Sequence, residues 1–418
     1  MGRPVKMEFV MRTLIGICLL ASIVIPARAQ YDAYGGWVKL KGKKTGFFHT
    51  QQIDGRWWLV TPDGNVFLSK GVCAVGPARN RNAPAMPPEE LAKWNKSTKE
   101  QLRGWNFNTI SVDGRRARVP EMAYTAILNL ASAQQPNVWR DGIVLDYFSP
   151  EFAAAVEREA ETLCRPLAND PWLLGYYPDT ELKWFPDIRG TDTVLQSFLK
   201  KPPESPGYQR ALAFLKERGH TPETMTEEDK SAFLEVAAAQ YGRVSTEAIR
   251  RNDPNHMILG MRFNEHVPIP LSRGLGPYFD VLSLDIYEYR APVYKLGEMN
   301  RLTGKPTLIT EFSFKAMDSG NPNTVGAGEP VLTQQDRADL FAAYVEDLAN
   351  LPSCVGYHWF QYRDQPKSST GTSPGGFGAE NSNYGVVQVD GTPWDLLTKR
   401  MTRENGAVEA LHAKSRAR

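Results

Sequence analysis

Two glutamates, Glu181 and Glu311, stand in matching contexts that could support acid–base and nucleophilic chemistry. Each ends a short apolar run and has aromatic neighbours, such as Trp184 after the first of them. A buried strand that delivers an acidic side chain at its carboxyl end is how a barrel of alternating strands and helices presents a catalytic group. Two carboxylates that converge on one cleft are the minimum equipment for glycoside hydrolysis. A single glutamate at a strand end is usually solvated or salt-bridged, so the inference depends on the pair.

Runs of strand length alternate with helical patterns along most of the chain, which predicts parallel β/α units. Eight such units predict the α/β fold class, as a closed (β/α)8 TIM barrel rather than an open sheet. The expected strands are residues 67–72, 105–112, 124–130, 172–181, 257–263, 279–287, 305–311 and 355–362. The expected helices include residues 88–104, 152–163, 208–218, 226–253, 333–350 and 394–413.

An N-terminal extension, residues 30–66, is expected to fold as a short β-hairpin that caps the bottom of the barrel. Asp54-Gly55 separates two apolar runs, and Asp63-Gly64 leads into a third. Asp-Gly between apolar runs is the strongest short-range hairpin signal. Residues 67–418 are then expected to form one catalytic barrel.

The first 29 residues, 1–29, have the pattern of a signal peptide. Three basic residues precede an apolar stretch, residues 14–26, that is too short to span a bilayer, and Ala27-Arg28-Ala29 forms a cleavage site before Gln30. We therefore expect a secreted or periplasmic protein without stable membrane association; the alternative is a retained N-terminal anchor. This segment has a net charge of +3, so the remainder has −1 of the total of +2, which does not indicate nucleic-acid binding.

The remaining cysteines and the histidines do not form a metal-binding pattern. Cys73, Cys164 and Cys354 are widely spaced, so we expect buried free thiols or at most one disulfide. The six histidines lack ligand spacing, so neither a metal nor another cofactor is expected. Aromatic residues make up 11% of the chain, and their rings can stack on sugars, although core packing accounts for most of them.

Four phrases of the sequence resemble those of a known family. They are residues 175–184, which read Gly-Tyr-Tyr-Pro-Asp-Thr-Glu-Leu-Lys-Trp, and residues 54–64, 280–285 and 383–386. With them the chain resembles the retaining glycoside hydrolases of clan A, and most of all the β-agarases of glycoside hydrolase family 50. The resemblance spans nearly the whole chain after residue 29. It does not include the large N-terminal module of typical agarases of that family, which we expect this chain to lack.

The resemblance implies a role for each of four residues. In clan A the acid/base ends strand four and the nucleophile ends strand seven, which makes Glu181 the acid/base and Glu311 the nucleophile. Tyr287 matches a tyrosine that hydrogen-bonds the nucleophile, and Trp359 matches the tryptophan that forms the floor of the −1 sugar site. A retaining double displacement requires the two carboxyl groups to lie about 5–5.5 Å apart.

Five further residues are candidates for substrate binding. Thr180 stands where the clan has an asparagine that binds the sugar 2-hydroxyl, and it can donate one hydrogen bond there. Arg262, on strand five, could hold the nucleophile or a sugar hydroxyl. Asp179 belongs to the same phrase as Thr180, and Trp184 and His358 are candidate subsite walls. A place in the core or in a salt bridge is the alternative for Tyr287, Trp359 and Arg262.

The sequence thus predicts an enzyme that acts on a β-linked, galactose-containing polysaccharide of the agar type or on its oligosaccharides. The linkage, endo or exo action and the oligomeric state stay open. The alternatives are a β-galactosidase or another clan A exo-enzyme, and a non-catalytic carbohydrate-binding protein that keeps an aromatic cleft. Two stretches rich in Gly and Ser, residues 318–328 and 368–383, follow strand ends and are candidate substrate loops; ordinary surface loops are the alternative.

Overall fold

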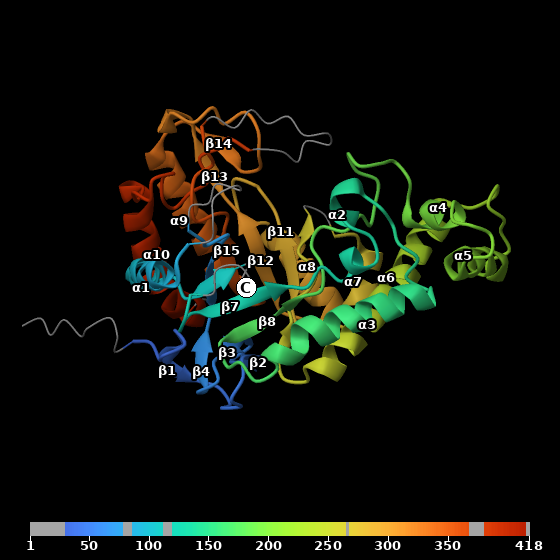
Figure 1. Ribbon diagram of the computed structural model, residues 1–418, viewed down its shortest axis with the longest axis horizontal. Helices are drawn as coiled ribbons and strands as arrows, with labels where there is room; N and C mark the ends of the chain where they lie inside the picture. Colours follow the sequence, from blue (N-terminus) through green and yellow to red (C-terminus); the bar gives the residue numbers. More distant parts are fainter. Residues whose placement is uncertain (1–29, 78–85, 112–118, 265–266, 368–379, 415–418) are drawn as a thin grey trace, which may run out of the picture.

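The computed structural model describes residues 30–77, 86–111, 119–264, 267–367 and 380–414 (Figure 1). The predicted signal peptide and residues 368–379 of the second predicted loop lie outside the described residues. Within the described ranges the chain has a mixed α/β fold, in which helices surround one curled parallel sheet.

Nine strands form this central sheet, and neighbouring strands run parallel. In sheet order they are β10 (Phe263–Asn264), β11 (Leu282–Asp285), β12 (Thr307–Phe312), β15 (Cys354–Trp359), β5 (Ser69–Cys73), β6 (Thr109–Ser111), β7 (Ala123–Ile127), β8 (Leu173–Tyr177) and β9 (Met257–Ile258). The two edge strands, β9 and β10, are separated along the chain only by residues 259–262. Each predicted strand position overlaps at least one of these strands.

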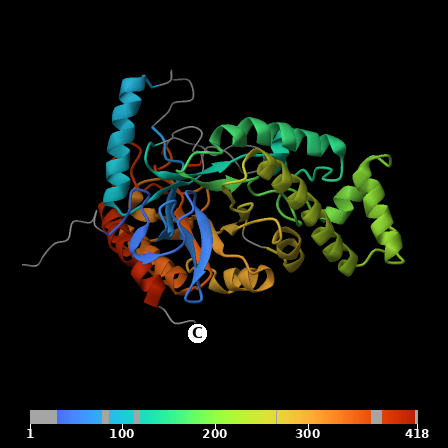
Figure 2. The same cartoon turned by 90° about the horizontal axis from the view of Figure 1, so that it is seen from below.

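The helices lie around the outside of the sheet, as the view from below shows (Figure 2). They are α1 (Pro88–Gly104), α2 (Val138–Asp141), α3 (Pro150–Cys164), α4 (Val194–Leu199), α5 (Pro206–Glu217), α6 (Glu227–Asn252), α7 (Ile269–Leu275), α8 (Val293–Thr303), α9 (Gln334–Asn350) and α10 (Asp395–Lys414). Helix α6 begins with the predicted capping box: the Thr226 hydroxyl accepts from Asp229 N, and the Asp229 carboxylate accepts from Thr226 N. Helices α4 and α5 extend away from the sheet on the side of α6 (Figure 1).

The N-terminal extension is larger than the predicted hairpin. The strands β1 (Trp37–Lys41), β2 (His49–Ile53), β3 (Arg56–Val60) and β4 (Asn65–Phe67) form an antiparallel sheet of order β1-β4-β3-β2. Phe48, Leu59 and Phe67 of this sheet join one buried cluster with side chains from the amino ends of the central strands, such as Leu174 and Val355. The small sheet therefore covers the amino ends of the central strands, as the view from below shows (Figure 2).

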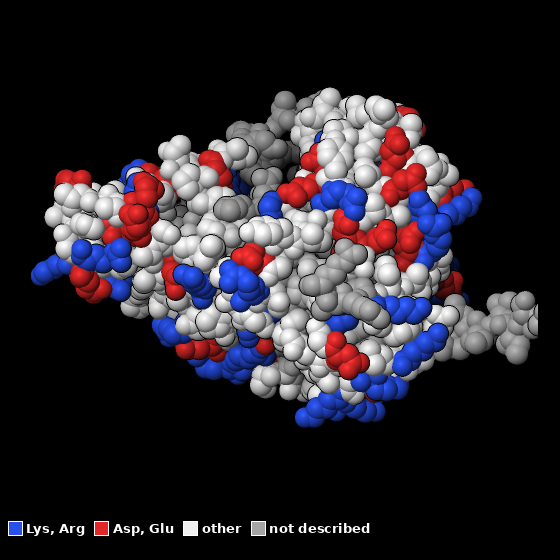
Figure 3. Space-filling view, turned by 180° about the vertical axis from the view of Figure 1, so that it is seen from behind, with Lys and Arg blue, Asp and Glu red and all other residues white. Residues whose placement is uncertain are grey.

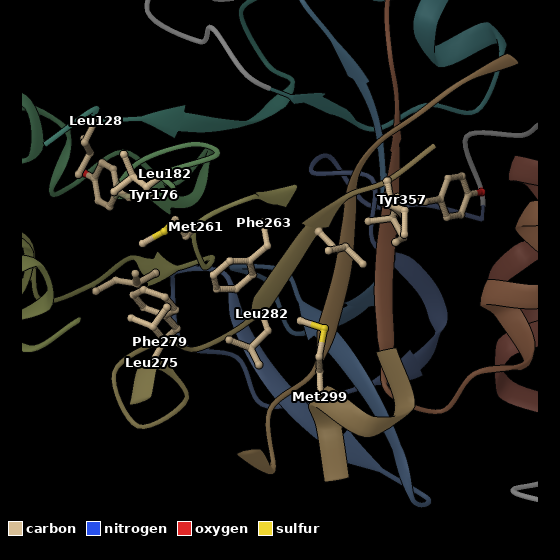
Figure 4. Packing of buried hydrophobic residues seen from close by; sticks show 14 of the residues in the cluster. Leu128, Tyr176, Leu182, Met261, Phe263, Leu275, Phe279, Leu282, Met299 and Tyr357 are labelled. Carbon is tan, nitrogen blue, oxygen red and sulfur yellow. The ribbon is translucent and has the colours of Figure 1, made fainter. Parts of the chain in front are cut away.

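A second and larger buried cluster fills the space between the central strands and the helices (Figure 4). Phe263 and Leu282 of two neighbouring strands and Met299 of α8 belong to it. Burying one such side chain completely stabilises the fold by about 1.5–3 kcal/mol relative to leaving it exposed. The rigidity of the strand ends therefore comes from apolar packing on the outer side of the sheet.

Some sequence expectations on membranes, metals and thiols concern the described residues directly. In these ranges, no helix combines the length and the apolar character needed to cross a membrane. The same residues contain no group of three or more His, Cys, Asp and Glu side chains placed to hold a metal ion. Cys73, Cys164 and Cys354 are buried free thiols. The face seen from behind carries interspersed charges of both signs (Figure 3).

Candidate active site

Glu181 lies just beyond the carboxyl end of β8, in a left-handed backbone conformation with a φ of 48°. Such a conformation costs a non-glycine residue about 1–3 kcal/mol and persists only where the surroundings fix it. Here two arginines do so: Glu181 N donates to Arg262 O at 3.2 Å, and Arg189 Nη1 donates to Glu181 O at 2.7 Å. Asp187 in turn holds the Arg189 guanidinium at 2.6 Å. The main chain that carries the partly buried Glu181 side chain is therefore held by both arginines.

Glu311 lies on β12, with 13% of its side chain exposed. Tyr287 Oη donates to Glu311 Oε2 at 2.5 Å, and Arg262 Nη2 donates to Glu311 Oε1. Burial and the neighbouring Glu311 raise the pKa of Tyr287 well above its usual range, so its hydroxyl stays a donor. One neutral and one cationic donor therefore hold the two carboxylate oxygens in fixed directions.

Arg262 connects the two glutamates. Its Nη1 donates to Thr180 Oγ1 at 3.0 Å, and its Nη2 lies 3.1 Å from Asp285 Oδ2 as well as against Glu311. Burial opposes its charge, but Asp285 and Glu311 outweigh that effect and raise the pKa of Arg262 well above its usual range. Glu181 adds to this stabilisation. One buried cation therefore lies within electrostatic reach of both glutamates and bonds the residue that precedes Glu181.

Asp179 does not line the cleft, which corrects its predicted role in substrate binding. Its buried carboxylate accepts hydrogen bonds from Ala131 N at 3.0 Å and from Tyr241 Oη at 2.6 Å. Burial raises the pKa of Asp179 to about 7, although both hydrogen bonds act against that shift. The residue ties the chain before Thr180 and Glu181 to α6 and to the segment after β7.

Trp184 and His358 were predicted as subsite walls, and the structure places both in the core. Trp184 donates from Nε1 to Met261 Sδ at 2.9 Å, and its ring lies 5.4 Å from that of Tyr147. His358 Nε2 lies 2.8 Å from Ser69 Oγ, and burial lowers the pKa of this histidine to about 3, so its ring is neutral. Neither side chain is exposed enough to contact a polysaccharide.

Trp359 is also misassigned, because it points away from the cleft. Its side chain is fully buried and donates to Tyr384 O at 2.8 Å. Its ring centroid lies 5.8 Å from that of Phe341 on α9. Successive residues of a strand face opposite sides, so a shift of one residue exchanges the two faces. The next residue, Phe360, is partly exposed, and its ring centroid lies 6.3 Å from that of Tyr287. Phe360 is therefore the aromatic residue that strand eight brings to the cleft.

The two predicted substrate loops are joined by asparagines. The first follows β12 and connects β13 (Phe314–Ala316) with β14 (Glu329–Val331), a parallel pair at the top of Figure 1. Asn381, in the described part of the second loop, accepts from Thr324 N and Val325 N at 3.0 Å each. Its neighbour Ser382 donates to Val325 O at 2.9 Å. Hydrogen bonds therefore join the described parts of these loops into one loop unit, which follows the carboxyl ends of β12 and β15.

Glu380 was not among the predicted site residues, although it belongs to the second predicted loop. Burial is the largest cause that raises the pKa of Glu380 to about 7, and the negative charge of Glu311 is the next. Lys315 lowers this pKa, and Glu181 raises it. A third carboxyl group thus interacts electrostatically with both glutamates. A glutamate in a segment rich in glycine and serine gives no periodic or strand-end signal, so the sequence did not distinguish it.

The chain can be compared with proteins of known function and structure. No protein-family model matches it. Beta-agarase B of Vibrio sp. (strain JT0107) is 25% identical over 514 residues, which cover 97% of this chain and 52% of that protein. Beta-agarase A of the same strain is 24% identical over 448 residues, which cover 83% of this chain and 44% of that protein. The chain spans about half the length of these curated relatives.

Solved structures show the same fold. The protein described as BpGH50 has a TM-score of 0.80 and 21% identity, covering 94% of this chain and 88% of its own. A structure described as an exo-beta-agarase has a TM-score of 0.77 and 20% identity, covering 92% of this chain and 68% of its own. The chain is similar to the β-agarases of glycoside hydrolase family 50. The resemblance inferred from the sequence phrases is thereby confirmed.

Proposed function

We propose that this protein is a retaining β-glycoside hydrolase that cleaves agar-type, galactose-containing polysaccharide or its oligosaccharides. The observation that carries the proposal is the link through Arg262, which bonds Glu311 and Thr180 and interacts with Glu181. A buried cation between two strand-end carboxylates fits a site that needs both in defined positions. The similarity to β-agarases supports the substrate class.

The proposed reaction is a double displacement. Glu311 attacks the anomeric carbon while Glu181 protonates the leaving oxygen, which gives a covalent glycosyl-enzyme. Glu181 then takes a proton from the water that displaces Glu311, and the β configuration is retained. The Thr180 hydroxyl accepts from Arg262, so its own hydrogen is free to donate to a sugar hydroxyl. Tyr287 and Arg262 hold the attacking carboxylate.

The proposal extends to the architecture and the location of the protein. We take β9 and β10 as two pieces of one barrel strand, since β9 pairs with β8 and β10 pairs with β11, so that the sheet closes as a (β/α)8 barrel. Residues 67–418 form the catalytic domain, and residues 1–29 are a signal peptide. The exported protein should then start at Gln30; N-terminal sequencing that finds residues 14–26 retained contradicts the secreted or periplasmic assignment.

The test compares single variants on agarose oligosaccharides and on an activated aryl β-galactoside. Glu311→Gln should abolish turnover of both substrates, because no group remains to form the glycosyl-enzyme. Glu181→Ala should fail on the oligosaccharide, whose leaving group needs protonation, yet still form a covalent intermediate with the aryl substrate. Added azide should then accelerate turnover and give the β-azide. Glu298→Gln, in an exposed pair with Arg301 on α8, is the control and should leave all rates unchanged.

The stereochemistry distinguishes the roles. Azide rescue of Glu311→Ala with an α-azide product supports Glu311 as the nucleophile, because the anion replaces the missing carboxylate in one inverting step. Exchange of the two stereochemistries means that the roles of Glu181 and Glu311 are reversed. Wild-type activity in both variants sinks the proposed function.

A further inference from the structure

Glu380 belongs to the bonded loop unit. The residue directly after it, Asn381, is held by Thr324 and Val325 of the first loop. The Glu380 side chain lies against the α-carbon of Gly326: a β-carbon built at Gly326 would lie 3.3 Å from Glu380 Cβ. It would also lie 1.6 Å from Tyr384 Oη, so only glycine allows this approach. Contacts from both loops therefore fix the start of the Glu380 side chain, and its carboxylate accepts from Gln365 Nε2 at 3.5 Å.

Lys315 lies on the same loop unit, next to Glu380. Its Nζ donates to Gly326 O at 3.0 Å, and it interacts electrostatically with Glu380 and with Glu329. Lys315 follows Glu311 by four residues along the chain. Glu311, Lys315 and Glu380 therefore occupy one region. Lys315 is partly buried, and burial lowers its pKa.

Carboxyl groups outnumber cations in this region. Arg262 is already engaged with Asp285 and Glu311, and Lys315 is shared between Glu380 and Glu329. A negatively charged ligand would be repelled by these carboxylates. Among the described groups that make these contacts, both cations are already paired. A ligand that presents hydroxyl groups can donate to a carboxylate and accept from a lysine ammonium.

We propose that Glu380, with Lys315 beside it, is a specificity-determining residue that binds a hydroxyl of the sugar next to Glu311 and rejects sugars carrying a sulfate or carboxylate at that position. The inference rests on the proposed function and narrows its substrate class to neutral galactose units. Rejection by a like charge is how binding sites commonly obtain specificity. The charge responsible is lost as the pH falls through about 7, the pKa to which burial and Glu311 raise the Glu380 carboxyl.

The experiment measures binding without turnover, in the Glu311→Gln background. Isothermal titration calorimetry compares a neutral agarose oligosaccharide with its galactose 6-sulfate counterpart at pH 8 and pH 5. Adding Glu380→Gln should raise the affinity for the sulfated ligand, relative to the neutral one, by roughly fivefold or more at pH 8. Two unit charges about 4 Å apart give a factor of this size even in bulk water. The effect should shrink at pH 5. Glu298→Gln, in the exposed pair with Arg301 on α8, is the control and should leave the ratio unchanged.

An unchanged ratio in Glu380→Gln, or a change of the same size in Glu298→Gln, overturns the inference. Hydrolysis of agarose by the otherwise unaltered protein is measured separately. Charge selectivity without any hydrolysis refutes the proposed function and leaves the role of Glu380 standing. Hydrolysis with equal affinity for both ligands refutes the role of Glu380 alone. If neither ligand binds, both fail.

Discussion

Asp179 and Arg262 show that the site depends on charged side chains with little access to solvent. Asp179 is 2% exposed and Arg262 is 3% exposed, so neither can be screened effectively by water. An ionised group in such a place is costly unless it is paired and hydrogen-bonded. Arg262 has two carboxylate partners, whereas Asp179 has only neutral donors. The two residues should therefore respond differently to pH.

Asp179→Asn should remove a pH dependence of stability. Burial raises the folded-state pKa of Asp179 to about 7 from a usual value of 3.8, so the folded protein binds more protons than the unfolded chain between these values. Wild-type stability therefore falls as the pH rises through that window. The asparagine cannot ionise, so the variant should gain on the order of 2–3 kcal/mol relative to wild type from pH 5 to pH 8. Denaturant unfolding at both pH values measures the difference; parallel responses contradict the expectation.

At the scale of elements, the sequence predicted the strands well, because apolar runs and helix caps are local signals. It failed where a single residue of register decides the outcome. Trp359 and Phe360 are adjacent aromatics, and only the packing of the first against α9 shows which one faces the cleft. It also failed for Glu380. This residue is positioned by contacts between two loops, and loops show neither the helical nor the strand periodicity that predicts elements. The loop unit itself is open to test.

Asn381→Ala should loosen the loop unit more than the whole fold. The change removes three hydrogen bonds, to Thr324 N, Val325 N and Thr324 Oγ1, from a side chain that is buried. Losing this bonding should lower kcat/KM on the polysaccharide about tenfold, with a shift in Tm of only a few degrees. Asn300→Ala is the control, because its side chain bonds Lys305 O beyond α8. A similar loss of kcat/KM in both variants would argue against a specific role of the loops.

At the scale of the whole molecule, a buried ion pair fastens the last helix to the first strand of the central sheet. Lys70 Nζ of β5 lies 2.6 Å from Glu409 Oε1 of α10, with both side chains 1% exposed. Lys70 also donates to Asn405 O at 3.0 Å and lies 4.6 Å from the ring centre of Tyr31. The start and the end of the described chain therefore meet at the same strand of the central sheet.

Removing one member of this pair should cost far more than removing both. Glu409→Leu alone leaves a buried unpaired ammonium and should lower the free energy of unfolding by about 3–5 kcal/mol, whereas the double variant Lys70→Met, Glu409→Leu should recover most of that loss. Lys295→Met in the half-exposed pair with Glu288 should change it by less than about 1 kcal/mol. Denaturant unfolding of the four proteins provides the measurement. A double variant that is no more stable than Glu409→Leu alone would show that the pair is not coupled.

The contacts made by Arg262 also affect how such a site can change during evolution. One guanidinium contacts Thr180, Asp285 and Glu311, which come from three separate strand ends. A substitution at any of them alters the partner that the other two share, so its effect depends on which residues already occupy the remaining positions. Variation at these positions is therefore expected to be inherited in combinations. Among relatives of this chain, the residues at the positions of Thr180 and Arg262 should change together rather than one at a time.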